Sequence, residues 1–373
     1  MNSHAMNETE ALIALNMLPK IGPVRVRRLM EMCGGAAAVL KASTSTLCKA
    51  SGVGADTAAI VRKWESHVDL AGELQRMKEM NISLFTEADE AWPEGLRQMH
   101  DAPLLLYVQG KVEPRDRSAI GIVGSRKATA YGLTCAKKFA FQLAHAGVTV
   151  LSGLARGIDT AAHEGAVAAK GRTIAVIGSG LGRLYPPENR ALADRIADGH
   201  GAVVSEFPIL TEPDKQTFPQ RNRIVSGWSQ GILVAEAPAW SGALITANNA
   251  ADQGRAVYAI PGPIDRPTST GCNKLIQNGA RLVLDAADIL DDMNALLPPS
   301  AMPASEASAS QPPATLTEME RTIWDALAEG ETQLDVIITR TKLDAATASA
   351  QLMRMELKRL VKQLPGRYYV RNS

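Results

Sequence analysis

The middle of the chain, from about residue 92 to residue 297, alternates short apolar runs with stretches of helical periodicity. Near-continuous apolar runs separated by helices are typical of parallel strands that are covered on both faces. We therefore predict an α/β fold built on a parallel sheet. The predicted strands are residues 119–123, 148–151, 173–177, 202–205, 231–235, 256–260 and 282–284.

The preceding region, residues 7–84, shows short helical patterns and no strand pattern. In two places, residues 18–24 and 50–55, an apolar residue and a glycine-containing turn lead into a helix, as in helix-hairpin-helix elements. We predict a helical, SAM-like domain here. Such turns can present backbone N–H groups to a DNA phosphate. They are equally compatible with a compact helical domain in which they serve only as turns.

The C-terminal region begins with residues 298–314, which are rich in proline, alanine and serine, as in a flexible linker. Helical patterns then cover residues 316–327, 334–341 and 345–360, and residues 361–371 predict a β-hairpin that turns at residues 365–366. Three helices and a hairpin predict a winged helix over residues 315–373. The α/β domain then covers residues 85–297. The sequence is compatible with either DNA binding or protein docking by this winged helix. The basic residues of its third helix and wing are Arg354, Lys358, Arg359, Lys362, Arg367 and Arg371.

Composition narrows the function classes only slightly. The net charge is +1, so nucleic-acid binding requires that basic residues cluster. Aromatic residues make up 4% of the chain, so a base-stacking surface would depend on few side chains. The four cysteines are widely spaced and no histidine stands at ligand spacing, which predicts no metal site and no cofactor. No signal peptide and no membrane-spanning run is evident, so we expect a cytoplasmic protein without membrane insertion.

Glycine-containing turns follow three of the predicted strands. They are Gly124-Ser125-Arg126, the run from Ser152 and Gly153 to Arg156, and the run from Gly178 to Arg183. A turn of small residues that delivers a strand to a helix N-terminus makes an anion site, because the first N–H groups of a helix lack intrahelical partners. An arginine in each turn adds a planar donor suited to phosphate. The three junctions predict a surface that holds phosphates without cleaving them.

Several enzyme classes are disfavoured by their missing motifs. The chain has no P-loop, and Arg183 occupies the third glycine position of a near-match to the dinucleotide fingerprint at residues 178–183. Residues 227–231 match the string of a nucleophile elbow, but the predicted strand follows the string instead of preceding it. Glu236 is the one carboxylate placed where a general base might act. We predict no catalytic residues.

The run from Phe218 to Ile224, which follows a polar loop containing Lys215, combines cations with one aromatic ring. We predict that a helix begins at Asn222, with Arg221 and Arg223 beside its N-terminus, where they suit phosphates and nucleotide edges. Phe218 supplies a face on which a base can stack. The two arginines can instead form ion pairs with Glu206 or Glu236. Together with Arg126, Arg156 and Arg183, however, so many cations in one crevice would repel one another without a polyanion.

These motifs, taken together, resemble those of the DNA-processing protein A family, also called DprA or Smf. The residues that carry the resemblance are residues 121–126, 152–163, 218–224, 241–246, 258–262 and 271–279. The resemblance implies a recombination mediator that binds single-stranded DNA, protects incoming DNA during natural transformation and loads RecA. It also implies an extended Rossmann-like fold for the middle domain and a homodimer without enzymatic activity. The N-terminal and C-terminal regions match the family's architecture more loosely.

The resemblance also assigns roles to individual residues. Backbone phosphate would be held by Gly124, Ser125 and Arg126, by Arg156, and by the cluster Arg221, Asn222 and Arg223. Phe218 and Lys215 would line a pocket for a base. The matching motifs add Ser152, Gly153, Ser241 and Gly242 to the predicted DNA-binding residues. Two alternatives are a nucleotide-processing Rossmann-type hydrolase and a regulator that binds duplex DNA through the winged helix.

Overall fold

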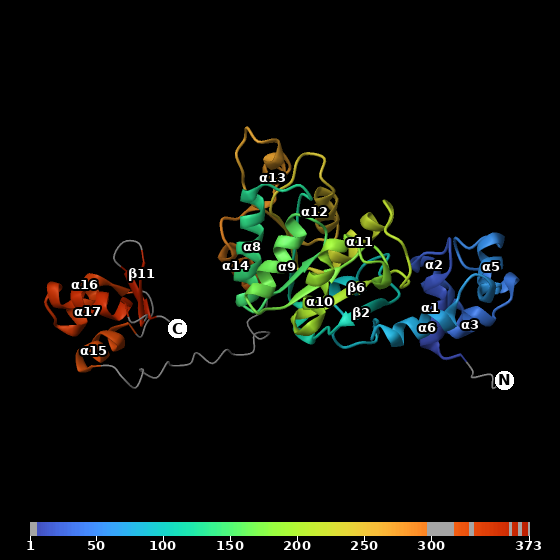
Figure 1. Ribbon diagram of the computed structural model, residues 1–373, viewed down its shortest axis with the longest axis horizontal. Helices are drawn as coiled ribbons and strands as arrows, with labels where there is room; N and C mark the ends of the chain where they lie inside the picture. Colours follow the sequence, from blue (N-terminus) through green and yellow to red (C-terminus); the bar gives the residue numbers. More distant parts are fainter. Residues whose placement is uncertain (1–5, 297–316, 328–331, 358–359, 365–367, 372–373) are drawn as a thin grey trace. The chain divides into compact units, whose positions relative to one another are not determined.

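One twisted sheet, in strand order β1-β2-β6-β5-β4-β3-β7-β8-β9, forms the centre of the computed structural model, which describes residues 6–296, 317–327, 332–357, 360–364 and 368–371 (Figure 1). From β6 to β9 all neighbours are parallel, whereas β1 and β2 pair antiparallel at one edge. The strands are β1 Ser83–Phe85, β2 Leu106–Gly110, β3 Ala119–Val123, β4 Thr149–Ser152, β5 Thr173–Val176, β6 Gly201–Ser205, β7 Gly231–Val234, β8 Ala256–Ala259 and β9 Arg281–Leu282.

Helices cover both faces of this sheet, which explains why its strands are apolar at successive positions. Alternate side chains of β3 enter different cores: Ile120 and Ile122 pack with α8 and α9, and Val123 packs with α11 and α12. The helices of this region are α7 Glu94–Arg97, α8 Ala130–His145, α9 Ile158–Ala168, α10 Arg190–Arg195, α11 Thr217–Trp228, α12 Gly242–Asp252, α13 Thr270–Gln277 and α14 Ala286–Leu296.

All seven strands predicted from the sequence are present, with ends that shift by one or two residues. The predicted α/β class with a mainly parallel sheet is therefore confirmed. The antiparallel strands β1 and β2 were not predicted. β1 has three residues, and neither strand stands between two helical patterns of the kind that marks a parallel strand.

The N-terminal helices have a core of their own. They are α1 Glu8–Met17, α2 Pro23–Cys33, α3 Ala36–Lys41, α4 Thr44–Leu47, α5 Ala55–Arg62 and α6 Leu70–Glu79. The two predicted hairpin turns precede α2 and α5, and Arg28 of α2 donates to the carbonyl of Ser51 in the second turn (3.2 Å). Glu73 of α6 is buried and accepts a hydrogen bond from the backbone N–H of Ile209 (2.8 Å). Residues up to Leu296 form one compact unit.

The second compact unit contains the predicted winged helix. Its elements are α15 Glu318–Ala326, β10 Thr332–Gln333, α16 Leu334–Thr341, α17 Ala345–Leu357, β11 Val361–Leu364 and β12 Tyr368–Arg371. The strands form a sheet in the order β10-β12-β11, so the prediction of three helices and a hairpin is confirmed. The predicted linker, residues 298–314, lies outside the described residues, as do Lys358, Arg359, Arg367 and the turn at residues 365–366. The described helices include none that is long and apolar enough to cross a membrane.

Candidate nucleic-acid interface

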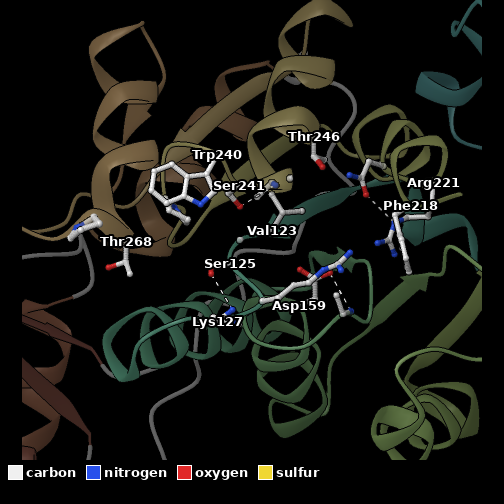
Figure 2. Close-up of a pocket in the computed structure, with 18 residues that line it drawn as sticks. Val123, Ser125, Lys127, Asp159, Phe218, Arg221, Trp240, Ser241, Thr246 and Thr268 are labelled. Atoms are coloured by element: carbon white, nitrogen blue, oxygen red, sulfur yellow. Dashed lines mark hydrogen bonds between the residues drawn. The ribbon is translucent and has the colours of Figure 1, made fainter. Parts of the chain in front are cut away.

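A pocket of about 590 Å³ opens at the edge of the sheet where β3 ends. Ligands of open α/β sheets bind at the carboxyl ends of the strands, and typical ligand pockets measure about 300–1,000 Å³. The pocket brings together residues from several motifs that are distant in sequence (Figure 2). Its lining includes Gly124, Ser125, Arg126, Phe218, Arg221, Asn222, Ser241 and Gly242, which were predicted, and Lys127, Asp159, Trp240, Thr246 and Thr268, which were not.

The turn after β3 is held tightly, and its arginine is exposed. A Cβ atom at Gly124 would lie 2.5 Å from Cγ1 of Ile158 and 2.7 Å from the carbonyl oxygen of Glu236, so glycine is required by close packing. The Ser125 N–H donates to the Glu236 carbonyl (2.7 Å), and the Ser125 hydroxyl accepts from the Lys127 N–H (3.1 Å). Two backbone donors of the turn are therefore already used. A phosphate here would be held by the side chains of Arg126 and Lys127.

Helix N-termini at this edge differ in what they hold. At α8, the carboxylate of Glu236 accepts from both the N–H and the hydroxyl of Thr129 (2.7 Å each), so a protein anion already occupies the position predicted for phosphate. At α12, the first turn has no acidic residue, and only the Ser241 hydroxyl caps it, accepting from the Ala243 N–H (3.3 Å). Because Ser241 and Gly242 line the pocket, the partial positive charge of α12 faces it.

Phe218 forms the wall of the pocket beside Arg126. The guanidinium of Arg126 lies 4.8 Å from the Phe218 ring centroid, and the ring of Tyr185 lies 6.1 Å away on a tilted plane. A Cβ at Gly178 would lie 2.8 Å from Cδ1 of Phe218, so a small residue there makes room for the ring. Thr217 donates to the Gly178 carbonyl (2.5 Å), which fixes the start of α11. An aromatic face and a free cation are thus adjacent.

The predicted helix start at Asn222 is wrong, because α11 begins at Thr217. Arg221 and Asn222 therefore lie in its second turn, where Arg221 is buried and Asn222 is half-buried. Arg221 is 4% exposed and donates through Nη1 to the carbonyls of Gly153 (2.5 Å) and Val176, and through Nε to Oδ1 of Asn222 (3.0 Å). Burial lowers the pKa of Arg221 to about 10, and the charge of Asp159 opposes that shift. These contacts hold the loops after β4 and β5 together.

We expected the arginines of the motifs to lie unpaired in one crevice. This expectation is wrong for Arg156, Arg183 and Arg223, each of which has a carboxylate partner. Arg156 pairs with Glu188 and donates to the Tyr185 hydroxyl (3.3 Å). Arg183 pairs with Glu212 (3.0 Å) in a 3₁₀ turn, Leu181–Arg183, so the third junction leads to no α-helix directly. Arg223 is bound by Glu206 (2.5 Å) and Asp101 (3.2 Å), away from the pocket. Among the described residues, Arg126 has no carboxylate partner within 4.0 Å.

The remaining predicted residues divide between the scaffold and the surface. The Ser152 hydroxyl is buried and donates to the Ile122 carbonyl (2.6 Å), so its side chain contacts no pocket. Gly153 makes room for the guanidinium of Arg221, which a side chain would displace. Lys215 is exposed in the turn before α11, outside the lining of the pocket. Their assignment to DNA binding stays a prediction.

Among the pocket residues that were not predicted from the sequence, Trp240 is the most important. Its side chain is 82% exposed in the turn between β7 and α12. Figure 2 shows Trp240 and Phe218 on opposite sides of Ser125 and Val123. A large aromatic residue in a turn next to a motif of small residues is the signal that would have identified it. The recognised motifs begin at Ser241, one residue later.

Glu236 does not stand where a general base would act. Its side chain is 3% exposed, and both oxygens accept hydrogen bonds from Thr129. A carboxylate used in this way positions the start of α8 and has no free oxygen facing the pocket. The arrangement therefore disfavours the hydrolase alternative, which depended on this residue.

His163 belongs to the buried network beneath the pocket and is not paired with Asp159. Its Nδ1 lies 2.7 Å from the hydroxyl of Thr173, which itself donates to the Val150 carbonyl. The hydroxyl therefore accepts from His163, so Nδ1 carries the proton. Nε2 is buried and has no hydrogen-bond partner in the described part of the chain. Burial, together with the charge of Arg221, lowers the pKa of His163 to about 3.

This depressed pKa predicts a loss of stability in weak acid. An unfolded histidine binds a proton near pH 6.5 and the folded one does not, so His163 destabilises the fold as pH falls below about 6.5 and down to about 3. From pH 7 to pH 5 we expect a loss of about 2 kcal/mol from this residue. Urea unfolding of wild type and His163→Asn at both pH values measures it. The difference between the two proteins should shrink by that amount at pH 5, whereas a constant difference would contradict the assignment.

Comparison with known proteins supports the family suggested by the motifs. The family described as DNA recombination-mediator protein A matches residues 83–294, and the DprA winged helix domain matches residues 307–367. Protein Smf of Synechocystis is 32% identical over an alignment of 397 residues that covers 98% of this chain and 100% of that protein. Protein Smf of Escherichia coli is 38% identical over 294 residues, 78% of each chain.

Solved structures agree with this relationship. The X-ray structure of DNA processing protein A from Streptococcus pneumoniae has a TM-score of 0.68 at 34% identity and covers 77% of this chain and 99% of that one. DNA processing protein A from Helicobacter pylori, whose structure concerns its single-stranded DNA binding mode, has a TM-score of 0.52 at 26% identity, covering 58% and 97%. The resemblance predicted from the motifs is thus confirmed: this chain belongs to the DNA recombination-mediator protein A family, also called DprA or Smf.

Proposed function

We propose that this protein is a recombination mediator that binds single-stranded DNA and has no catalytic activity of its own. The observation that carries the proposal is the contact of Arg126 with Phe218 in a pocket at the carboxyl edge of the sheet. A cation without an acidic partner suits a backbone phosphate, and a ring beside it suits a base. Neither group reads a particular sequence, so the binding would be sequence-tolerant.

The proposal extends to the cellular role that family membership suggests. The protein would act in the cytoplasm as a homodimer, protect incoming DNA during natural transformation and load RecA onto it. Support comes from the relatives named as DNA processing proteins and from the Helicobacter pylori structure with its single-stranded DNA binding mode. Within the site, phosphate would meet Arg126, Lys127 and the N-terminus of α12, and Arg156 once it leaves Glu188.

Fluorescence polarisation with a labelled poly-dT oligomer and the matching duplex tests the binding step on the full chain. The proposal requires preference for the single strand and dependence on Arg126. If the duplex binds as tightly as the single strand and Arg126→Ala leaves the affinity unchanged, the result would support a regulator that binds duplex DNA through the winged helix. Release of free base from nucleoside monophosphates would support the hydrolase. RecA ATPase activity on the same oligomer, with and without this protein, tests the loading step.

Salt dependence gives a quantitative prediction. Three cations near the pocket, Arg126, Lys127 and Lys215, have no carboxylate within 4.0 Å in the described ranges. Each phosphate contact on a single strand contributes a slope of about −0.7 to the log–log plot of affinity against salt concentration. Three contacts at this pocket alone therefore predict a slope of about −2, and any further phosphate contact makes the slope steeper. Titration at several salt concentrations measures it, and a slope near zero would remove the electrostatic basis of the proposal.

A further inference from the structure

Trp240 is exposed to an extent that the fold does not explain. It is 82% exposed, whereas Trp92, Trp228 and Trp324 are buried and Trp64 is half-buried. Its ring contributes to no core cluster of the described residues. An indole on the wall of the pocket, opposite Phe218, presents a π-face larger than that of Phe218 (Figure 2).

A second cavity lies next to the wall that carries Trp240. It has a volume of about 610 Å³, includes Thr129, Tyr131, Pro261 and Arg266 in its lining, and shares Thr268 with the first pocket. The two cavities therefore adjoin along the loop that precedes α13. The hydroxyl of Tyr131 donates to the Pro261 carbonyl (2.8 Å), which fixes the Tyr131 ring at the rim.

The electrostatics of this second cavity favour an anion. Arg266 is exposed, and no carboxylate of the described residues lies within 4.0 Å of it. The one carboxylate in the lining, Glu236, is occupied by its two hydrogen bonds from Thr129. An exposed guanidinium without an internal partner is free to form charge-assisted hydrogen bonds with a phosphate.

We propose that Trp240 and Arg266 form a second nucleotide subsite beside the one formed by Phe218 and Arg126. Trp240 stacks on a base of the single strand, and Arg266 binds a neighbouring phosphate. The strand then runs along the edge of the sheet from Phe218, past Trp240 and Thr268, into the second cavity. The inference rests on the proposed function, since it adds a subsite to the same binding surface. Because stacking requires a base, Trp240 distinguishes DNA from a bare sugar-phosphate backbone.

The experiment uses the full chain with two labelled oligomers, poly-dT and an abasic strand of equal length. Trp240→Ala should weaken poly-dT binding about 10-fold and leave abasic binding unchanged, and Trp240→Phe should recover most of the loss. Arg266→Ala should weaken both oligomers and reduce the salt slope by about 0.7. Tryptophan fluorescence should be quenched when poly-dT binds wild type, and much less in Trp240→Phe.

Matched controls are an exposed aromatic residue and an exposed arginine outside both cavities. Phe141 on α8 is 43% exposed. Arg195 is the last residue of α10, and the chain enters the amino end of β6 at Gly201, so Arg195 lies away from the carboxyl ends of the strands. Phe141→Ala and Arg195→Ala should leave binding unchanged. Unaltered poly-dT affinity and quenching in the Trp240 variants, while Arg126→Ala still weakens binding, would overturn the second subsite alone. If wild type binds no single strand, the proposed function itself fails.

Discussion

Replacing Arg126 and Phe218 together by alanine is expected to weaken single-stranded DNA binding by about 3 kcal/mol or more, which is over 100-fold. A hydrogen bond to a charged group contributes about 1.5–3 kcal/mol, and a base stacked on an aromatic ring about 1–3 kcal/mol. Arg126 is exposed and Phe218 half-buried, so neither replacement should threaten the fold. The measurement is fluorescence polarisation with poly-dT.

The two single variants should not add up to the double variant. Because the guanidinium lies 4.8 Å from the ring centroid, removal of either group alters the position of the other. The matched control is the double variant Phe141→Ala/Arg195→Ala, which removes the same two residue types elsewhere. Circular dichroism and thermal unfolding should show both double variants folded. If the folded Arg126→Ala/Phe218→Ala protein retains wild-type affinity, the pocket is not the DNA site.

The sheet and the motifs were predictable because they depend on local pattern. Apolar runs identified seven of the nine strands in the described sheet, and small residues identified the turns at which the chain passes closely over itself, as at Gly124. The antiparallel strands β1 and β2 lack that signal. α11 begins five residues before the predicted start, and Pro219 lies within its first turn, where proline is tolerated because the first N–H groups of a helix have no intrahelical partner.

Which arginine is free could not be read from the sequence, because the answer depends on tertiary neighbours. Arg156, Arg183 and Arg223 find carboxylates at Glu188, Glu212 and Glu206, which are 32, 29 and 17 positions away in the chain. Likewise, Glu236 reaches the start of α8 from 107 positions away. A motif specifies that an arginine stands at a strand end, but only the fold determines whether its charge is already neutralised.

Arg221 shows why this matters for experiments, because its replacement is expected to damage the protein itself. Asp159 lines the pocket but is largely buried, so burial raises the pKa of Asp159 while the charge of Arg221 lowers it. Its carboxylate accepts from the N–H groups of Gly153 (3.1 Å) and Ala155 (3.3 Å). Arg221→Ala leaves that carboxylate without its countercharge and two carbonyls without their donor.

A buried polar group left without its hydrogen-bond partner costs about 1–3 kcal/mol. Because Arg221→Ala leaves the Gly153 and Val176 carbonyls without this donor and removes the charge that stabilises the Asp159 carboxylate, it should lower the melting temperature of the first unit by about 5–20 °C. Thermal unfolding at neutral pH measures this shift. An unchanged melting temperature would contradict the buried role. Loss of DNA binding in Arg221→Ala alone therefore carries no information about phosphate contact.

A charge-neutral pair of replacements separates the two roles of Arg221. Arg221→Met/Asp159→Asn keeps side-chain volume and removes both charges, so it should recover part of the stability lost in Arg221→Met. If the folded double variant binds poly-dT nearly as wild type does, Arg221 supports the pocket walls and Arg126 meets the phosphate. If it is folded and binds at least 10-fold more weakly, the Arg221 guanidinium contacts DNA directly, as the motif suggested. The buried position of Arg221 and its hydrogen bonds to the Gly153 and Val176 carbonyls favour the first result.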